Sequence, residues 1–350
     1  MNKEPKNRST EVPKVDHAFV LVLWIFGSWS FAWSQDIVIS STASDPAARI
    51  KKLGTILDFT GTDLKLRSTL GTEETVPAAR VVQFQTRWTP AHEAGRVARI
   101  EGRLDDAIAA LRQAKRDEPR AWAVRQIMSD LTGCYLEAGR IDSAGDEFLG
   151  ILASDPATRH FDVAPVAWRG IALSPTVETR AGAWLAARSM PAAALLGASW
   201  LLATRRGEAV PALEEISRST DPRLAGLAAI QLWRTKVVAA TADDVRRWQT
   251  QLEKMPPDIQ ATGSYVLGDV LARQEQPEAA SLAYLKVPIL FHQQRPMAAD
   301  ALLAAGKQLE KMSQNRQAAE VYRELVRDFP HLAGAKEAAG RLEQLQPTAR

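Results

Sequence analysis

One residue spacing recurs along this 350-residue chain and limits what it can fold into. A small residue is followed after twelve positions by alanine, and then at steps of four and three by two more apolar residues. Copies of this ladder begin at Gly95, Thr132, Gly197, Gly268 and Gly306. A self-similar unit of this length is typical of stacked helical hairpins, so the sequence predicts a helical-repeat solenoid.

Proline marks the end of most copies. It follows five residues after the last apolar position in three of them, at Pro119, Pro156 and Pro330. In the Gly197 copy it comes one place late, at Pro222, and in the Gly268 copy it is missing. Because proline cannot continue a helix, each of these positions is expected to lie just beyond a helix end.

Local signals from Trp88 onward also favour antiparallel helix pairs. Thr89 is a suitable N-cap before Pro90, which the first turn of a helix tolerates. Gly102 and Gly139 interrupt the apolar helical period in the middle of the first two units, and we expect a turn at each. A small residue on the first helix, opposed by alanine on the second, lets the two backbones approach closely.

The ladder of small, alanine, large, small and proline residues resembles the tetratricopeptide repeat (TPR), a helix–turn–helix unit of about 34 residues. The resemblance covers most of residues 88–346 and implies a mainly α fold, an α-solenoid of TPR-like hairpins. Residues 175–188 and 224–252 are expected to supply helices for degenerate units in the two long gaps. The units depart from the family in lacking its opening tryptophan and in being longer.

Residues 35–87 differ from the rest in composition. Short β-type runs at 37–39, 55–59, 64–66 and 81–84 alternate with the glycine–threonine pairs 54–55, 61–62 and 71–72, which we expect to form turns. Leu64 and Leu66, with Leu70 as a further candidate, have the period of a half-buried strand. This pattern predicts a small β-meander or SH3-like segment that packs against the first helices.

The first 34 residues are typical of an export signal. A charged leader precedes an uncharged apolar run at residues 18–33, and Ala32-Trp33-Ser34 has small residues where signal peptidase needs them. We therefore expect cleavage after Ser34 and a location in the periplasm or cell envelope. The alternative is an uncleaved membrane anchor at residues 18–33, a run shorter than the roughly 20 residues that a membrane span needs.

The sequence shows no sign of enzymatic chemistry. Basic and acidic residues nearly balance, at 44 and 41, which leaves no electrostatic footprint for nucleic acid. The lone Cys134 excludes an internal disulfide and is expected to be a small buried hydrophobe. The histidines beyond the leader are too scattered for a metal-binding helix face, and the common nucleotide, metalloprotease and hydrolase motifs are absent. We expect no catalytic residue, cofactor or metal.

Two other patterns receive a structural interpretation. Trp168, Trp184 and Trp200 are sixteen residues apart, and Trp233 and Trp248 fifteen, which is about one helix and a turn. This spacing favours a core role over a ligand cage, because tryptophan is largely buried in most proteins. The polar run at 159–162, after the second unit, is expected to be a connector.

The TPR resemblance also implies a concave surface lined by the first helix of each pair. Carried over to this sequence, the groove-facing positions are His92, Arg96, Arg99, Gln126, Ser129, Glu137, Tyr265, Asp269, Arg273, Leu303, Lys307 and Glu310. The first unit is basic and the later units are mixed in charge, which favours an acidic or C-terminal peptide near residues 92–99. For each of these residues the alternative is a solvated helix face.

Two functions of different classes stay open. The first is a non-enzymatic scaffold of the cell envelope that grips a protein or peptide in the solenoid groove. The second is an enzyme or small-ligand-binding module with a pocket between the β segment and the first helices. A compact cluster of carboxylates or histidines there would favour the second function, and an open, continuous groove would favour the first. We expect the first.

Overall fold

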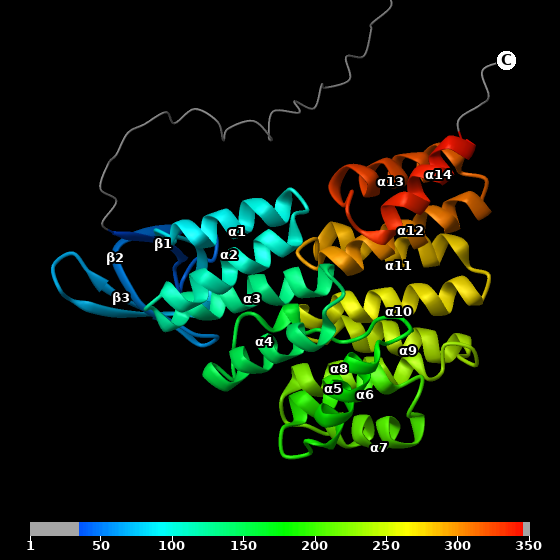
Figure 1. The fold of residues 1–350 in the computed structure, drawn as a ribbon, viewed down its shortest axis with the longest axis horizontal. Coiled ribbons are helices and arrows are strands. Elements are labelled where there is room, and N and C mark those ends of the chain that lie inside the picture. Colours follow the sequence, from blue (N-terminus) through cyan, green and yellow to red (C-terminus); the bar gives the residue numbers. More distant parts are fainter. Residues whose placement is uncertain (1–34, 346–350) are drawn as a thin grey trace, which may run out of the picture.

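The computed structural model describes residues 35–345, in which fourteen α-helices follow a small β-sheet (Figure 1). The expected signal or anchor at residues 1–34 lies outside the described residues. Among the helices of residues 35–345, none combines the length and the apolar character that a membrane crossing requires. The chain is therefore a mainly α protein with a β segment before its helices.

The sheet is an antiparallel meander with one returning strand. Its strands are β1 (Asp36–Ser41), β2 (Arg49–Phe59), β3 (Asp63–Ser68), β4 (Glu73–Pro77) and β5 (Val81–Gln85). They lie in the order β4-β3-β2-β1-β5, because a short 3-10 turn after β4 leads the chain back to pair β5 with β1. The predicted β-meander is confirmed. Strand β4 was not predicted, since its sequence has one large apolar residue, Val76.

Two details of the predicted sheet are wrong. Gly54 is not in a turn but inside β2, opposite Ser68 of β3, where a Cβ atom would come within 2.1 Å of the Arg67 carbonyl oxygen. Leu70 lies in the turn after β3 and is 91% exposed, whereas Leu64 and Leu66 are buried as predicted. The alternation of buried and exposed residues therefore ends with β3.

The helices begin and end largely where the sequence signals indicated. They are α1 (Pro90–Ile100), α2 (Leu104–Asp117), α3 (Ala121–Glu137), α4 (Ile141–Ser154), α5 (Pro175–Ala186), α6 (Pro191–Leu201), α7 (Arg206–Ile216), α8 (Pro222–Arg234), α9 (Ala242–Glu253), α10 (Gln260–Arg273), α11 (Pro277–Leu290), α12 (Arg295–Lys311), α13 (Asn315–Asp328) and α14 (Ala333–Leu345). Thr89 caps α1 by accepting a hydrogen bond from the His92 backbone N–H. Gly102 and Gly139 form the predicted turns with positive φ angles, which glycine adopts without strain.

The two helices of each ladder copy pack against each other, as the repeat predicted, whereas α8 packs against α7 and α9 against α10. Gly95 of α1 lies against Leu111 and the Ala107 backbone of α2, and Gly268 and Gly306 lie against the rings of Tyr284 and Tyr322. Gly197 behaves differently, because it packs against the backbone of α5 and not against α7. Helix α6 is apolar and buried all round, so it has a close partner on both sides.

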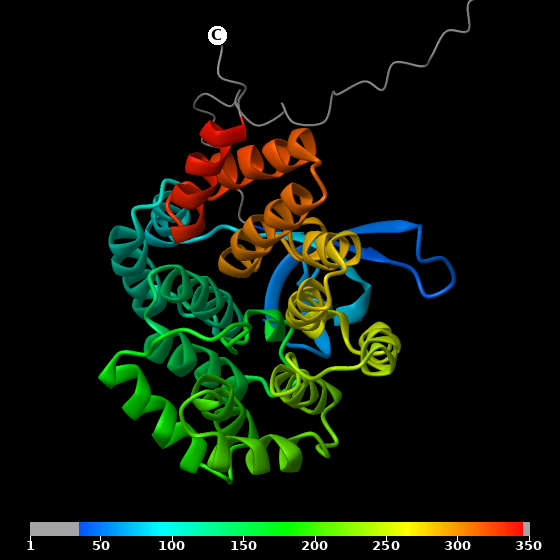
Figure 2. The same cartoon turned by 90° about the vertical axis from the view of Figure 1, so that its right-hand side faces the viewer.

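The array of helices curves until its two ends meet. Figure 2 shows the helices around a ring, with the first pair next to the last. Helix α3 contacts α12, and Gly102 in the turn between α1 and α2 lies against the His331 ring in the loop before α14. The predicted solenoid is confirmed, and it closes on itself.

The sheet is joined to the helices by an aromatic cluster. Trp122 of α3 is 1% exposed and donates a hydrogen bond from Nε1 to the Ile56 carbonyl of β2, at 3.2 Å. The rings of Phe84 and Trp88 each lie 5.7 Å from the Trp122 ring, edge to face, and Phe59 contacts Phe84 in the same way. The space between the sheet and α3, where a pocket was considered, is therefore filled by side chains.

Candidate functional site on the concave face

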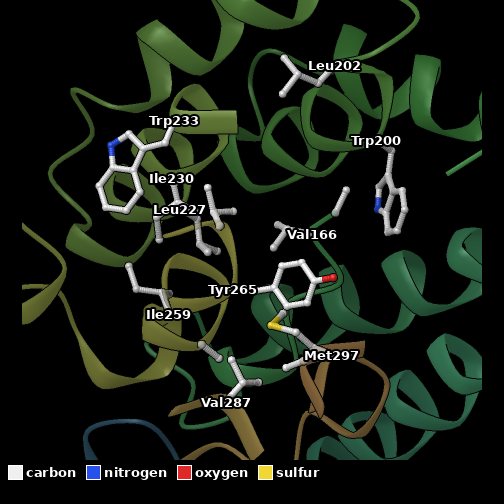
Figure 3. Packing of buried hydrophobic residues seen from close by; sticks show 14 of the residues in the cluster. Val166, Trp200, Leu202, Leu227, Ile230, Trp233, Ile259, Tyr265, Val287 and Met297 are labelled. Carbon is white, nitrogen blue, oxygen red and sulfur yellow. The ribbon is translucent and has the colours of Figure 1, made fainter. Parts of the chain in front are cut away.

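The centre of the ring is occupied by the chain itself. Residues 156–171, here called the inner segment, run between α4 and α5 without an α-helix or strand and cross the concave face (Figure 2). Figure 3 shows Val166 of this segment among the core side chains Trp200, Tyr265 and Met297. Phe161 is also buried, at 1% exposure. The polar run at 159–162 is thus a connector, as expected, but a buried one that fills much of the groove.

Side chains of the surrounding helices satisfy the backbone of the inner segment. The Arg223 guanidinium of α8 donates hydrogen bonds to the carbonyls of residues 156, 157 and 158, at 2.9–3.1 Å. Trp200 of α6 donates to the Pro165 carbonyl at 2.7 Å, and Gln231 of α8 donates to the Ala167 carbonyl at 3.0 Å. A segment without regular structure needs such partners when it is buried. It is therefore an integral part of the fold.

A cavity of about 410 Å³ remains between the inner segment and the first helices. Its walls come from α1, α3, the inner segment and the loop that leads into α12. The residues that line it are Arg99, Gln126, Ser129, Asp130, Gly133, Leu136, Arg159, His160, Asp162, Val163, Ala164, Trp168, His292, Gln293, Gln294, Arg295, Pro296 and Met297. Eight of these eighteen residues carry a charged or amide side chain, so we call it the charged cavity.

Three arginines of the charged cavity have too few carboxylate partners. Arg99 and Arg295 share the carboxylate of Glu137, whose Oε1 lies 2.6 Å from Arg99 Nη2 and 3.4 Å from Arg295 Nε. Among residues 35–345, no carboxylate lies within 4.0 Å of Arg159, whose Nη2 donates to Gln126 Oε1 at 2.6 Å. Burial lowers the pKa of Arg159 to about 10, so this arginine is still a cation at neutral pH. Asp130 and Asp162 also line the cavity, but neither lies within 4.0 Å of these three arginines, so guanidinium N–H groups are left for an acidic group.

A histidine–aspartate pair lies behind the same wall. His92 of α1 is 1% exposed, and its Nε2 lies 2.7 Å from Oδ2 of Asp130, which lines the charged cavity. The other ring nitrogen, Nδ1, is buried without a hydrogen-bond partner among the described residues. Asp130 holds the imidazole in place, and the imidazole orients this carboxylate toward α1.

Two titratable groups of the inner segment have shifted pKa values of opposite kind. Burial lowers the pKa of the His160 imidazole to about 3, and the charges of Arg159 and Arg125 add to this shift. Burial raises the pKa of the Asp162 carboxyl to about 6, and the nearby Asp258 adds to it. Both groups are therefore driven toward their neutral forms.

These shifts predict how stability depends on pH. The stability that comes from keeping His160 neutral is lost as pH falls below about 6.5. The stability that comes from keeping Asp162 protonated is lost as pH rises through about 6. The two effects on the free energy of unfolding therefore have opposite pH dependence and partly cancel. Asp162→Asn removes the second contribution. The variant should be about 2 kcal/mol more stable than the wild type near pH 7 and nearly equal to it near pH 4. Urea unfolding at both pH values measures this difference, and an equal difference at the two pH values would contradict it.

A second, more apolar cavity of about 230 Å³ adjoins the first. It is lined by Leu136, Glu137, Gly139, Ile141, Trp168, Arg169, Ile171, Trp200, Pro296, Asp300, Leu332 and Ala333. Trp168 is fixed there by its Nε1, which donates to Asp300 Oδ2 at 2.9 Å. We call this the tryptophan cavity.

The structure brings together only part of the residues that the TPR resemblance placed in the groove. Arg99, Gln126 and Ser129 line the charged cavity, Glu137 lines the tryptophan cavity, and His92 lies behind Asp130. Arg96 is exposed on α1 and lines neither cavity. The first two units therefore supply the predicted residues of this site.

Most groove positions of the later units are covered by the chain. Tyr265 of α10 is buried and points toward Val166 of the inner segment (Figure 3), and Asp269 accepts a hydrogen bond from the Tyr284 hydroxyl at 2.7 Å, while Arg273 is exposed. On α12, Leu303, Lys307 and Glu310 face α14, where Lys307 pairs with Glu337 and Glu310 with Arg341. Helix α14 thus covers the last unit, and the inner segment covers the middle of the array.

Sequence reasoning missed several residues of the site. Arg159, Asp162 and Trp168 belong to a segment without periodicity, and Arg295 begins a helix more than a hundred residues later. The dense polar composition of residues 159–162 was the available signal. Trp184, Trp200, Trp233 and Trp248 are buried as expected, but Trp200 also lines the tryptophan cavity. Cys134 is buried, as expected, and burial raises its pKa to about 12.

Comparisons with known proteins add little. No family model matches this chain, and no curated protein matches it. Among solved structures, the chain is similar to residues 1–338 of the assembly chaperone of RpL4 (Acl4), with a TM-score of 0.28 and 15% sequence identity over 73% of this chain and 95% of that chain. The assignment to helical repeats rests on the helix pairs of the chain itself.

Proposed function

We propose that this protein is a non-enzymatic binding scaffold of the cell envelope that holds a protein or peptide partner at the charged cavity of its concave face. The observation that supports this proposal is the set of side chains there: Arg99, Gln126 and Ser129 from the inner helices meet Arg159, a cation without a carboxylate within 4.0 Å among residues 35–345. An acidic side chain of a partner would supply the missing counter-charge.

The envelope location is proposed from the N-terminal sequence. The apolar run at residues 18–33 and the small residues Ala32 and Ser34 are typical of a segment that directs export. The same proposal divides the chain into a signal at residues 1–34, a β segment at residues 35–87 and a helical-repeat solenoid at residues 88–346. A change in mass of the exported protein that corresponds to cleavage after Ser34 would support it, and full-length protein in the membrane fraction would favour the anchor.

The proposed scaffold is tested by crosslinking and pull-down from the envelope fraction. Arg99→Glu reverses a charge that lines the charged cavity, and it should lower the yield of a specific partner by about tenfold or more, since a charge-assisted contact is lost and repulsion replaces it. Arg96→Glu is the matched control, because Arg96 lies on the same helix outside both cavities. Equal loss in the two variants, or in neither, would contradict binding at the charged cavity.

One observation favours a second candidate, an enzyme or small-ligand-binding module. The His92–Asp130 pair, at 2.7 Å, is an arrangement that can hold a general base, and Asp162 exchanges its proton near pH 6. The pocket for this function would be the charged cavity and not the filled space below the sheet. Turnover of a small molecule by the purified protein that is lost in Asp130→Asn would replace the scaffold by an enzyme.

A further inference from the structure

The charged cavity and the tryptophan cavity are neighbours with a common wall. Leu136, Trp168 and Pro296 line both of them. An extended group of two or three residues that enters at this wall could therefore place one side chain in each cavity. The two cavities differ in the side chains that line them. Together they therefore define which two side chains a bound segment must carry.

The charged cavity is suited to a carboxylate. Two guanidiniums, Arg99 and Arg295, share the single carboxylate of Glu137, while Asp130 of the same cavity pairs with His92 and Asp162 lies within 4.0 Å of neither arginine. Arg295 begins α12 next to the wall residue Pro296, and its buried Nε has no hydrogen-bond partner among the described residues. Arg159 adds a third guanidinium, and this one has no ion-pair partner inside residues 35–345. A carboxylate can accept hydrogen bonds from two such donors.

The tryptophan cavity is suited to an aromatic ring. Its volume of about 230 Å³ compares with the roughly 150 Å³ of an apolar protein cavity that takes up benzene. Trp168 and Trp200 offer ring faces and edges for the edge-to-face contacts that aromatic pairs prefer, and Leu136 and Ile171 supply aliphatic surface. Both indole N–H groups already donate to Asp300 and Pro165, so these rings are held in place before anything binds.

We infer that the segment recognised at this wall carries an acidic side chain next to an aromatic side chain, within a protein partner. The acidic side chain binds the arginines of the charged cavity, and the aromatic ring enters the tryptophan cavity. This inference rests on the proposed scaffold function and specifies its partner. The acidic group and the ring are both needed, because either alone would leave one cavity without a matching group.

Two substitutions test the two cavities separately. Arg159→Gln removes a cation of the charged cavity but keeps a hydrogen-bonding side chain, and Arg96→Gln is its control outside the site. Ile171→Trp places bulk at the tryptophan cavity; Ile171 is 42% exposed and lies outside any helix or strand, so the larger side chain has room to be accommodated. Ile100→Trp is its control, on an exposed position of α1. Circular dichroism and thermal unfolding check that all four variants fold.

The probes are capped peptides measured by calorimetric titration against the full chain. Two peptides carry glutamate next to phenylalanine, one in each order. In a third peptide glutamine replaces the glutamate, and in a fourth alanine replaces the phenylalanine. The wild type should bind at least one of the first two peptides about tenfold more tightly than either replacement. Arg159→Gln should abolish the preference for glutamate over glutamine, and Ile171→Trp the preference for phenylalanine over alanine, while the two controls keep both.

The outcomes separate this inference from the scaffold itself. Failure of the wild type to bind any peptide, or to prefer both groups, overturns the inference, as does a phenylalanine preference that survives in Ile171→Trp. If the envelope pull-down still yields a partner that Arg99→Glu loses, the scaffold stands and its specificity is different. If the pull-down yields none as well, both proposals fall.

Discussion

Trp122→Ala is expected to lower the free energy of unfolding by about 3–5 kcal/mol, the range found for removal of a large buried aromatic side chain. Trp122 is 1% exposed and lies at the centre of the aromatic cluster between the sheet and α3, in contact with Phe84 and Trp88. The substitution also leaves the Ile56 carbonyl without its donor. The loss should be concentrated where the sheet meets the helices.

Urea unfolding followed by circular dichroism measures this loss. Trp122→Phe is the matched variant, since it keeps an aromatic ring and removes the indole N–H, and it should cost clearly less than alanine. Hydrogen exchange should show the sheet opening before the helices in Trp122→Ala. A loss below about 1 kcal/mol would mean that the sheet does not depend on this joint.

Gly197→Val is expected to destabilise the protein by about 3 kcal/mol, at the upper end of the range for overpacking a core. A Cβ atom at Gly197 would lie 2.3 Å from the Leu185 backbone nitrogen and 2.4 Å from the Ala181 carbonyl oxygen. Both atoms belong to the backbone of α5, so no side-chain rearrangement can make room. Helices α5 and α6 must move apart, and the inner segment that Trp200 of α6 holds must move with them.

The control for this substitution is Gly207→Ala. Gly207 lies on the exposed face of α7, and nothing comes within 4 Å of a Cβ atom there. Because alanine is a better helix former than glycine, this variant should gain up to about 1 kcal/mol. Thermal and urea unfolding of both variants should therefore show changes of opposite sign. A Gly197→Val protein as stable as the wild type would refute the close contact between α5 and α6.

The helical part of the fold could be predicted because its signals are local. Gly102 and Gly139 occupy positions with positive φ angles, and Pro119 and Pro156 lie just after helix ends, so each leaves a mark in the sequence near the structure that it specifies. The partner of Gly197 could not be predicted in this way. Gly197 can face either the helix before α6 or the helix after it. Which of the two it faces depends on how α6 packs between α5 and α7.

The site could be predicted only in part, for a related reason. The TPR pattern places Arg99, Gln126 and Ser129 on inner helices, where they line the charged cavity. It gives no information on Arg159 and Trp168, because residues 156–171 follow no period that sequence inspection can detect. A solenoid filled by its own connector has the same repeat pattern as an open one, and long-range contacts decide between the two.

The contact between the Gly102 turn and the His331 loop has a consequence for how this molecule moves. An open solenoid is held only between neighbours, so its terminal units loosen first and the whole array can flex like a spring. Here each terminal pair has a second neighbour across the contact, and the interior cannot widen by flexing of the array. Access to the cavities should therefore depend on side chains at their rims, and amide protons of the first and last helices should exchange as slowly as those at mid-chain.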